Sequence, residues 1–582
     1  MVGVAVGAVG GVVLRRRGGG AVVAVGHQTP RRHPRAAHTA HHRECSELPG
    51  ASSDSPKDSR LPPPVWRLDE KLLALVVWAA LGGVACDLCT KSFYTKPFKS
   101  WSCQLSNTLK IFASVTRSHE YRSFCRLQCT YSCFPAMPVN KKSGCCGRGG
   151  RFYAGPKLVI MVAHPDDIQH ILVTSKLVER DPLSTSAMWP FVGDGLLTLN
   201  GSRWKTHRKL INPTFHSELL ENFLEAFHEG GLYFSERLAS DSAGGAAPAD
   251  VHVAAFFGAV RSFFSAAFGA DPDWLIPDIP EHEVTTALSR GLVLAQTMML
   301  QPWRRSKLLL RLSSEGRAVF KYYAHLRKCV EEVIAMRSAA TEEGPAKTRR
   351  RLLETLVKPG GQTALPVSEV RDELVTMTLT ATDTTAVCMS YALALLALHP
   401  EWQDAAHREL KDVFGEGGDY LRAPSLAELA SLRVLESIIK ETLRLFPVVP
   451  MLSRMVREEI WLSKGRVRVP KGAMLFVTPF LTHRLPQFFP DPLKFDPSRF
   501  LEGRCGEEHP CSYVPFGLGS RNCVGSQYAR LEVKVFLATV LRRFRFLPHS
   551  RWEDLEHATL TITLHTIKPI EVYCVPLQES GL

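Results

Sequence analysis

The chain of 582 residues is long enough for one large domain with additional segments, and its 45% hydrophobic and 22% charged residues exclude wholesale disorder. Its formal net charge of +14 is concentrated at one end, because residues 1–150 hold 21 Lys and Arg against 8 Asp and Glu while the rest is nearly balanced. This distribution argues against a basic nucleic-acid groove through the main domain.

The N-terminal part differs in composition from the remainder. Residues 1–70 are low in complexity, and their early arginines resemble a mitochondrial transit peptide. The apolar run Leu72–Cys86 is followed by lysines, so it predicts a membrane anchor at 71–87 that leaves the body on the cytoplasmic face; a buried core helix and the hydrophobic stretch of a signal peptide are the alternatives. The composition of residues 88–150 predicts an irregular Cys- and Lys-rich linker. Either a divergent N-terminal lobe or a faulty gene model would account for this composition.

Cysteine usage predicts a reduced compartment for the main domain. Nine of the 15 cysteines lie before residue 147, and the later ones form no C-x-x-C pair. Cys125, Cys129 and Cys133 are spaced four residues apart, but they lack the second ligand pair of a usual zinc module.

From residue 152 onward, hydrophobic periodicity predicts a mainly α domain with a minor β region over 151–582. The predicted elements, in chain order, are a strand at 157–163, a helix at 165–173, helices at 217–238, 318–337, 367–398, 400–413 and 431–445, a strand region near 460–469, a helix at 527–543 and a strand region near 560–575.

One Gly-rich loop, Tyr513–Gly525, precedes the last predicted helix and carries a single cysteine, Cys523. A thiol at a helix N-terminus beside Arg521 is expected to have a lowered pKa. Gly519 and Gly525 would let the backbone approach a large flat ligand and donate N–H groups to the sulfur. These are the requirements of an axial thiolate on haem iron, although most single cysteines are simply buried.

The residues Phe516, Gly519, Arg521, Cys523 and Gly525 match all fixed positions of F-x-x-G-x-R-x-C-x-G, the haem-binding signature of cytochrome P450 monooxygenases. The chain thus resembles that family, and most closely its family-4 clan, with an arthropod-type member as one reading. The resemblance implies the P450 fold, a single large catalytic domain behind the anchor, and haem b (iron protoporphyrin IX) with Cys523 as axial thiolate.

Two further motifs fall in the family's order. Glu441-Thr-Leu-Arg444 resembles the E-x-x-R of its K helix, where the spacing puts both charges on one helix face. Pro497-Ser-Arg-Phe500 resembles the P-E-R-F box with Ser in place of Glu. The resemblance implies that Arg499 joins Glu441 and Arg444 in an ionic cluster that supports the haem side.

The resemblance also implies residues that hold the haem propionates. Trp204 and Arg208 match the family's W-x-x-x-R, and Arg454 and Arg521 match its other propionate ligands. An indole N–H and guanidinium groups suit a carboxylate chemically. Taken singly, these arginines would be ordinary surface residues.

The segment Thr380–Thr385 resembles the family's oxygen-activating A-G-x-D-T-T on the I helix. Oxygen activation needs protons delivered into a dry pocket, so Asp383 and Thr384 are the candidate catalytic residues. Ala381 replaces the usual Gly and adds a methyl where the helix groove should be narrowest. Thr380 stands where many family-4 members carry a Glu that can bond to haem, so no covalent haem ester is expected.

The sequence therefore predicts a monooxygenase that inserts one oxygen atom of O2 into a lipophilic small molecule. Without a flavin or dinucleotide fingerprint, its electrons would come from a separate NADPH-cytochrome P450 reductase, with cytochrome b5 as a further donor. Its expected location is the endoplasmic reticulum membrane, with the mitochondrion as alternative. The rival functions are a P450-type isomerase or dehydratase acting on lipid peroxides, and a non-catalytic haem-binding protein. The pocket is expected near 184–196, 274–280 and 448–452.

Overall fold

The computed structural model describes residues 13–17, 20–24, 149–154, 157–175, 177–215, 221–270, 281–300, 306–339, 351–415, 420–501 and 509–577. The predicted anchor at 71–87 lies outside these residues, as do nearly all of the predicted linker and the candidate pocket segment 274–280. Near the N-terminus, β1 (Val13–Arg17) and β2 (Gly20–Ala24) pair antiparallel as a separate unit, with Val13 opposite Ala24.

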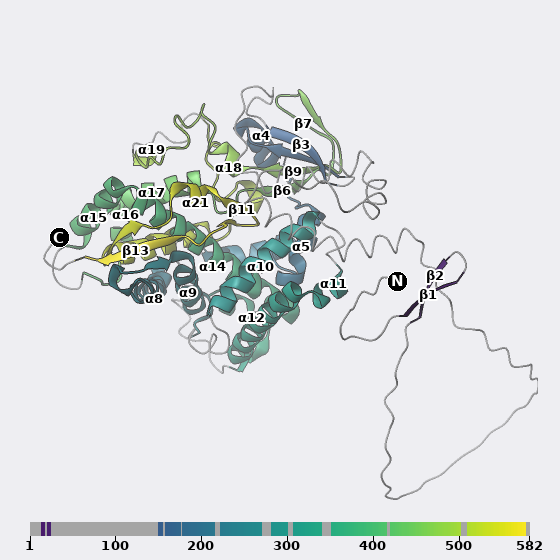
Figure 1. Cartoon of the computed structure of the whole chain (residues 1–582), viewed down its shortest axis with the longest axis horizontal. Helices are drawn as coiled ribbons and strands as arrows, with labels where there is room; N and C mark the ends of the chain where they lie inside the picture. The colour runs from purple at the N-terminus through teal and green to yellow at the C-terminus, as the bar shows by residue number, and fades with distance from the viewer. Residues whose placement is uncertain are drawn as a thin grey trace, which may run out of the picture. The chain divides into compact units, whose positions relative to one another are not determined.

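The part from Gly149 onward is mainly α with a minor β region, as predicted (Figure 1). Its longer helices are α5 (Pro182–Val192), α6 (Gly201–Ile211), α8 (Leu224–Ser242), α9 (Val251–Phe263), α10 (Glu281–Leu300), α12 (Ser314–Ala339), α14 (Val367–Leu398), α15 (Pro400–Phe414), α17 (Arg433–Leu445) and α20 (Ser526–Leu541). The shorter ones are α4 (Pro165–Gln169), α11 (Lys307–Leu312), α13 (Leu352–Leu356), α16 (Leu426–Ser431), α18 (Pro479–Thr482), α19 (Ser498–Leu501) and α21 (Trp552–Glu556).

Several helices have the bounds that periodicity predicted, and others differ. Helix α12 begins at Ser314, four residues before the predicted start, and the helix expected at 165–173 is α4 followed by the π-helical turn His170–Thr174. Helix α14 runs over the predicted 367–398, and α15 and α20 agree within two residues. Of the helix expected at 217–238, residues 217–220 lie outside the described residues; Glu221–Phe223 form a 3₁₀ turn, and α8 begins at Leu224. The helix expected at 431–445 begins at Arg433, because Leu432 has a non-helical ψ of 79° that separates α16 from α17.

The β part consists of small sheets. A four-stranded sheet has the order β3 (Gly149–Ala154), β4 (Lys157–Val162), β9 (Met474–Val477), β6 (Leu452–Met455), with β4 and β9 parallel and Val159 opposite Met474. A three-stranded sheet has the order β10 (Phe544–Pro548), β13 (Glu571–Pro576), β5 (Pro248–Asp250). Two hairpins complete the described strands, β7 (Ile460–Leu462) with β8 (Val467–Val469) and β11 (Ala558–Leu560) with β12 (Leu564–Thr566).

Helix α14 is the central helix of the domain, and it packs against α9, α17 and α20. By length and composition, α14 and the segment Val251–Phe268 could each cross a membrane, but 83% and 72% of these apolar windows are buried inside the protein. Both segments are therefore core helices of the domain. The sequence did not single out α9.

The first turn of α9 is fixed by its N-cap. The Asp250 carboxylate accepts hydrogen bonds from the backbone N–H groups of His252 at 2.9 Å and Val253 at 3.3 Å. These bonds satisfy two of the N–H groups that a helix start leaves without partners. Strand β5 leads directly into this cap, so the three-stranded sheet determines where α9 begins.

Candidate haem site

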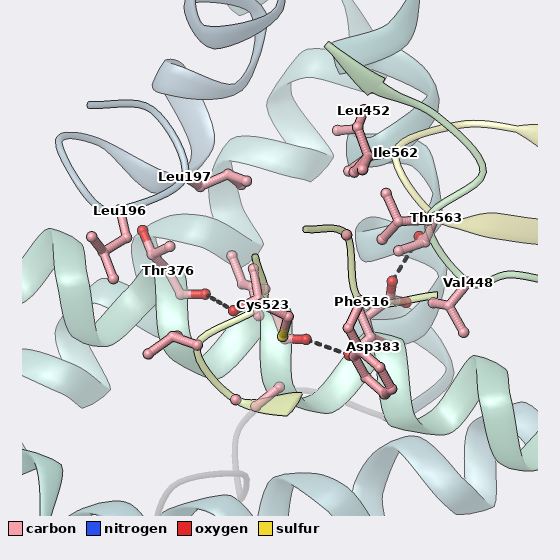
Figure 2. A pocket seen from close by; sticks show the side chains of 18 of the residues that line it. Leu196, Leu197, Thr376, Asp383, Val448, Leu452, Phe516, Cys523, Ile562 and Thr563 are labelled. Atoms are coloured by element: carbon pink, nitrogen blue, oxygen red, sulfur yellow. Dashed lines mark hydrogen bonds between the residues drawn. The ribbon is translucent and has the colours of Figure 1, made fainter. Parts of the chain in front are cut away.

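A cavity of about 390 Å³ lies between α14, α10, α5 and the Cys523 loop. Figure 2 shows Leu196, Val448, Leu452 and Ile562 around it, with Cys523 and Phe516 on the loop that closes one side. The segments 184–196 and 448–452 line the cavity as predicted. The sequence did not identify α10, which contributes Leu288, Leu292, Gln296 and Met299.

The Cys523 loop is held by close backbone contacts. Its Gly519 has a φ of +73°, and a Cβ there would lie 2.1 Å from the carbonyl oxygen of Leu172, so only glycine fits. The N–H of Cys523 donates to the Phe516 carbonyl at 2.9 Å. A Cβ on Gly525 would meet nothing closer than 4.0 Å within the protein, which leaves room beside the sulfur for a bulky ligand.

The thiol of Cys523 faces the cavity, and its expected lowered pKa is not what the structure gives. Burial raises the pKa of the Cys523 thiol, and this effect outweighs the N–H of Gly525 and the charges of Arg208 and Arg530, which lower it. The helix N-terminus and arginines are present as predicted. They act in a poorly solvated site, where the cost of an uncompensated anion is larger.

Four arginines from different segments line the same cavity: Arg180 before α5, Arg208 on α6, Arg454 on β6 and Arg521 in the 3₁₀ turn Gly519–Arg521. Among the described residues, none of the four forms an ion pair with Asp or Glu. Burial lowers the pKa of Arg180 to about 10. Burial and the other arginines lower the pKa of Arg454 to about 9 and that of Arg521 to about 8. Such a concentration of buried positive charge fits an anionic ligand.

The four arginines differ in how many donors they keep for a ligand. Arg208 donates to the carbonyl and side-chain oxygens of Asn522, both at 2.7 Å. Arg521 donates to the carbonyls of Val178, Leu196 and Leu199 and to Asn200 Oδ1. Arg454 makes one bond, to the Ser453 carbonyl, and its buried Nε has no partner. Arg180 Nε also has none.

Trp204 and Arg521 are closer to each other than the sequence indicated. The Arg521 guanidinium lies over the Trp204 ring, 3.9 Å from its centroid, so part of the Trp204 contribution is to position Arg521 by a cation–π contact. The sequence motifs did not identify Arg180. In the structure, the backbone N–H and carbonyl of Arg180 are both hydrogen-bonded to the side chain of Asn200, which lies just before the predicted Trp204 and Arg208 in the sequence.

The predicted Glu441–Arg444–Arg499 cluster is assembled in the structure. Arg444 and Glu441 are completely buried and form two bonds, Nε to Oε2 at 2.7 Å and Nη2 to Oε1 at 2.8 Å. Arg499 Nε lies 3.6 Å from Glu441 Oε1. The Arg444 Nη groups also donate to the carbonyls of His483, Pro492 and Lys494.

This cluster is linked by hydrogen bonds to the Cys523 loop. Nε2 of His483 accepts the N–H of Val514 at 2.9 Å, at the start of the loop. The Tyr513 hydroxyl donates to the Lys440 carbonyl at 2.9 Å, next to Glu441. Burial and the charge of Arg444 lower the pKa of His483 to about 3, which keeps its imidazole neutral and able to accept.

Asp383 and Thr384 both line the cavity, but neither side chain is free. The Thr384 hydroxyl donates to the Thr380 carbonyl at 2.7 Å, one of several such bonds along α14. Asp383 Oδ2 accepts a bond from Thr563 at 2.7 Å (Figure 2). Helix α14 runs without interruption through Ala381.

Sequence reasoning missed the histidines next to Asp383. Nε2 of His565 and of His252 lie 3.2 and 3.7 Å from Asp383 Oδ1. Burial raises the pKa of Asp383, but the two histidines outweigh it and hold the pKa well below its usual range. No local signal identifies this cluster, because its members are 131 and 182 positions apart in the chain.

The site is an apolar cavity with a thiol on one wall and arginines without acidic partners beside it, a set of side chains that fits an anionic cofactor. The family model described as "Cytochrome P450" matches residues 136–572. The chain belongs to the cytochrome P450 family, and it is accordingly a haem-dependent monooxygenase whose haem iron takes a cysteine thiolate as axial ligand.

Curated relatives agree with this assignment. The chain is 31% identical to human cytochrome P450 4V2 over 420 residues, which covers 70% of this chain and 78% of that protein. It is 29% identical to Drosophila melanogaster cytochrome P450 4c3 over 424 residues, with the same coverage. It is 30% identical to the probable cytochrome P450 4s3 of that fly over 449 residues, covering 74% of this chain and 86% of the relative. The resemblance to family-4 proteins, including arthropod ones, is thus confirmed.

Replacing Glu441 tests how much the domain depends on the buried ion pair. Glu441→Gln leaves the Arg444 charge uncompensated in the interior, so we expect a loss of about 3–5 kcal/mol in the free energy of unfolding. Urea denaturation measures it. Glu332→Gln is the control, since Glu332 pairs with Lys328 on the surface and the change should cost less than about 1 kcal/mol. Equal effects of the two substitutions would contradict the proposed importance of the pair.

Proposed function

We propose that this monooxygenase inserts one oxygen atom of O2 into a lipophilic small molecule, and that Cys523 is the thiolate ligand of its haem b. The observation that carries the assignment is the position of the Cys523 sulfur on the wall of an apolar cavity that unpaired arginines also line. When bound, the haem iron would activate O2 for transfer of one oxygen atom, with electron donation from the thiolate.

A spectrum tests the ligand assignment. The dithionite-reduced, CO-bound protein should give a strongly red-shifted Soret band, and Cys523→Ala should lose the shift while it still binds haem. The cavity-remote Cys574→Ala serves as control, because Cys574 is buried in strand β13. A red-shifted band that survives in Cys523→Ala would mean that another residue is the ligand.

We assign the propionate contacts to the four cavity arginines together with Trp204. Arg454 and Arg180 have unpartnered Nε groups, so they are the residues with donors to spare. Arg208 and Arg521 would contribute charge, while their present bonds fix the loop and the α6 region in place. Phe516, which lies under the Arg530 guanidinium, Gly519 and Gly525 shape the loop face toward the haem.

Substitution of Arg454 tests this assignment. Arg454→Gln should weaken haem binding roughly ten- to hundredfold, because a hydrogen bond to a charged group contributes about 1.5–3 kcal/mol. The rate of haem loss to excess apomyoglobin measures the effect. Arg468→Gln is the matched control, since Arg468 is exposed and pairs with Glu459. Equal haem loss from the two variants would remove Arg454 from the propionate set.

We assign proton delivery to Thr384 and Asp383. Both line the cavity, and the Thr384 hydroxyl needs only to exchange its bond to the Thr380 carbonyl for one to a water in the cavity. Asp383 is an ionised carboxylate at the adjacent position of the same helix, and because its pKa is held well below the usual range it would orient a proton-carrying water by its charge instead of holding the proton itself.

Thr384→Ala tests the proton role. With a reductase and a ligand that the unmodified protein oxygenates, NADPH oxidation should continue while product per NADPH falls about tenfold or more, since positioned proton transfers contribute about 10²–10⁴ in rate. The lost electrons should appear as hydrogen peroxide. Thr378→Ala is the control, because Thr378 makes the same kind of bond on α14 but does not line this cavity. Unchanged coupling, with turnover of a lipid hydroperoxide without NADPH, would favour the isomerase alternative.

The cavity walls support a lipophilic substrate. Beyond the loop they are formed mainly by aliphatic and thioether side chains: Val192, Leu196, Leu288, Leu292, Met299, Val448, Met451 and Ile562. Burying such surfaces favours an apolar ligand by about 25 cal/mol per Å².

We further propose NADPH-cytochrome P450 reductase as the electron donor, with cytochrome b5 as a second one, and the cytoplasmic face of the endoplasmic reticulum membrane as the location. The predicted anchor at 71–87 and the family-4 resemblance support these assignments.

A further inference from the structure

Three side chains from distant parts of the chain converge beside the haem cavity: His252 in the first turn of α9, Asp383 on α14 and His565 on β12. Their ligand atoms all lie within 4.8 Å of one another. The two imidazole rings are 5.1 Å apart and meet edge to face at 72°, so they do not stack. Both Nε2 atoms lie close to the same carboxylate oxygen, Asp383 Oδ1.

The centre of this group contains unsatisfied polar atoms. Asp383 is only 4% exposed, yet its Oδ1 makes no hydrogen bond, and the buried Nε2 of His252 makes none either. Among the described residues, no Lys or Arg forms an ion pair with Asp383. The two histidines are thus the neighbours of Oδ1, but neither makes a well-aligned hydrogen bond to it, which is a costly arrangement for buried polar atoms and one that a shared cation would relieve.

The separations fit a metal ion. Ligands held at about 2.0–2.2 Å in a tetrahedron are about 3.4 Å apart, and the two His–Asp separations here are 3.2 and 3.7 Å. We propose that His252, Asp383 and His565 form a binding site for a divalent transition-metal cation, of which Zn²⁺ is the probe. Two imidazoles and one carboxylate are a ligand set that Zn²⁺ accepts, and a fourth position is left for water.

Residues around the three ligands already hold them in orientation. The Thr563 hydroxyl donates to Asp383 Oδ2 at 2.7 Å, which directs the other oxygen toward the histidines. Thr563 Oγ1 also lies 3.0 Å from Nε2 of His565, a hydrogen bond that a cation on this nitrogen would replace. Asp250 caps α9 through the N–H of His252 itself and so fixes the backbone of this ligand. Hydrogen bonds of this kind orient metal ligands and raise metal affinity. The imidazoles keep side-chain exposures of 16% and 17%, which gives a cation a route in.

Occupancy would affect the proton role proposed for Asp383. A cation on Oδ1 would neutralise the carboxylate charge that orients the proton-carrying water, so the metal would inhibit oxygenation. This consequence rests on the proposed function, whereas binding itself does not. The competing occupant is a proton on His565, which would leave a simple His–Asp ion pair.

Calorimetric titration of the haem-loaded full chain with Zn²⁺, at neutral pH, tests the site without turnover. The histidine-rich segment 27–42 will bind Zn²⁺ too, so the result is the difference between variants. His252→Gln and His565→Gln should each lose one Zn²⁺ equivalent and keep the unmodified CO spectrum. The control His549→Gln, an exposed histidine outside the cluster, should lose none from this site.

Loss and retention of the Zn²⁺ equivalent in the cluster variants lead to different conclusions. Loss of the same equivalent in both cluster variants supports the metal site, and either correctly folded variant alone suffices if the other loses its haem. An unchanged number of Zn²⁺ equivalents in the cluster variants would overturn it and leave the His–Asp ion pair as the explanation. A failed monooxygenase assay has no bearing on this measurement, because binding is read as heat.

Discussion

The buried pair of Arg444 and Glu441 is the interaction on which the haem side of the domain depends. Arg444 uses its remaining donors on the carbonyls of His483, Pro492 and Lys494, so one side chain ties helix α17 to an otherwise irregular segment. His483 in turn accepts the N–H of Val514, where the Cys523 loop begins. Both members of the pair are completely buried, so the charge of each is tolerated only because the other is present. The position of the thiol is therefore set by an ion pair far from it in sequence.

The cavity beside that loop has the opposite electrostatic character. Arg180, Arg454 and Arg521 have no acidic ion-pair partner among the described residues; desolvation lowers the pKa of all three, and repulsion by neighbouring arginines adds to this for Arg454 and Arg521. Such an arrangement is stable only when an anion completes it, and a dicarboxylate porphyrin with an anionic sulfur ligand on its iron meets this need. The raised pKa of Cys523 follows the same logic, because a thiolate buried without a metal is as unfavourable as an arginine buried without an acid.

The sequence predicted the fold class, the helix α14 and the Glu441–Arg444–Arg499 cluster because each depends on local periodicity or on a fixed motif. It did not predict α9 or the break at Leu432, which depends on one ψ angle. For the site, it identified Cys523, Arg208 and Arg454 but not Arg180 or His565. These two reach their places through the packing of distant segments, and nothing in the neighbouring residues distinguishes them from surface residues.

Helix α14 shows why motif and geometry give different information about Asp383 and Thr384. The motif places them side by side, but the helix turns successive side chains in different directions. Thr384 is bonded back to its own helix, while Asp383 meets Thr563 and His565 from the C-terminal hairpin. The Thr384 hydroxyl is thus bonded to its own helix, whereas the pKa of Asp383 is lowered by His565 on β12 and His252 on α9. Asp383 and Thr384 are adjacent in sequence, but their side chains lie in two different environments.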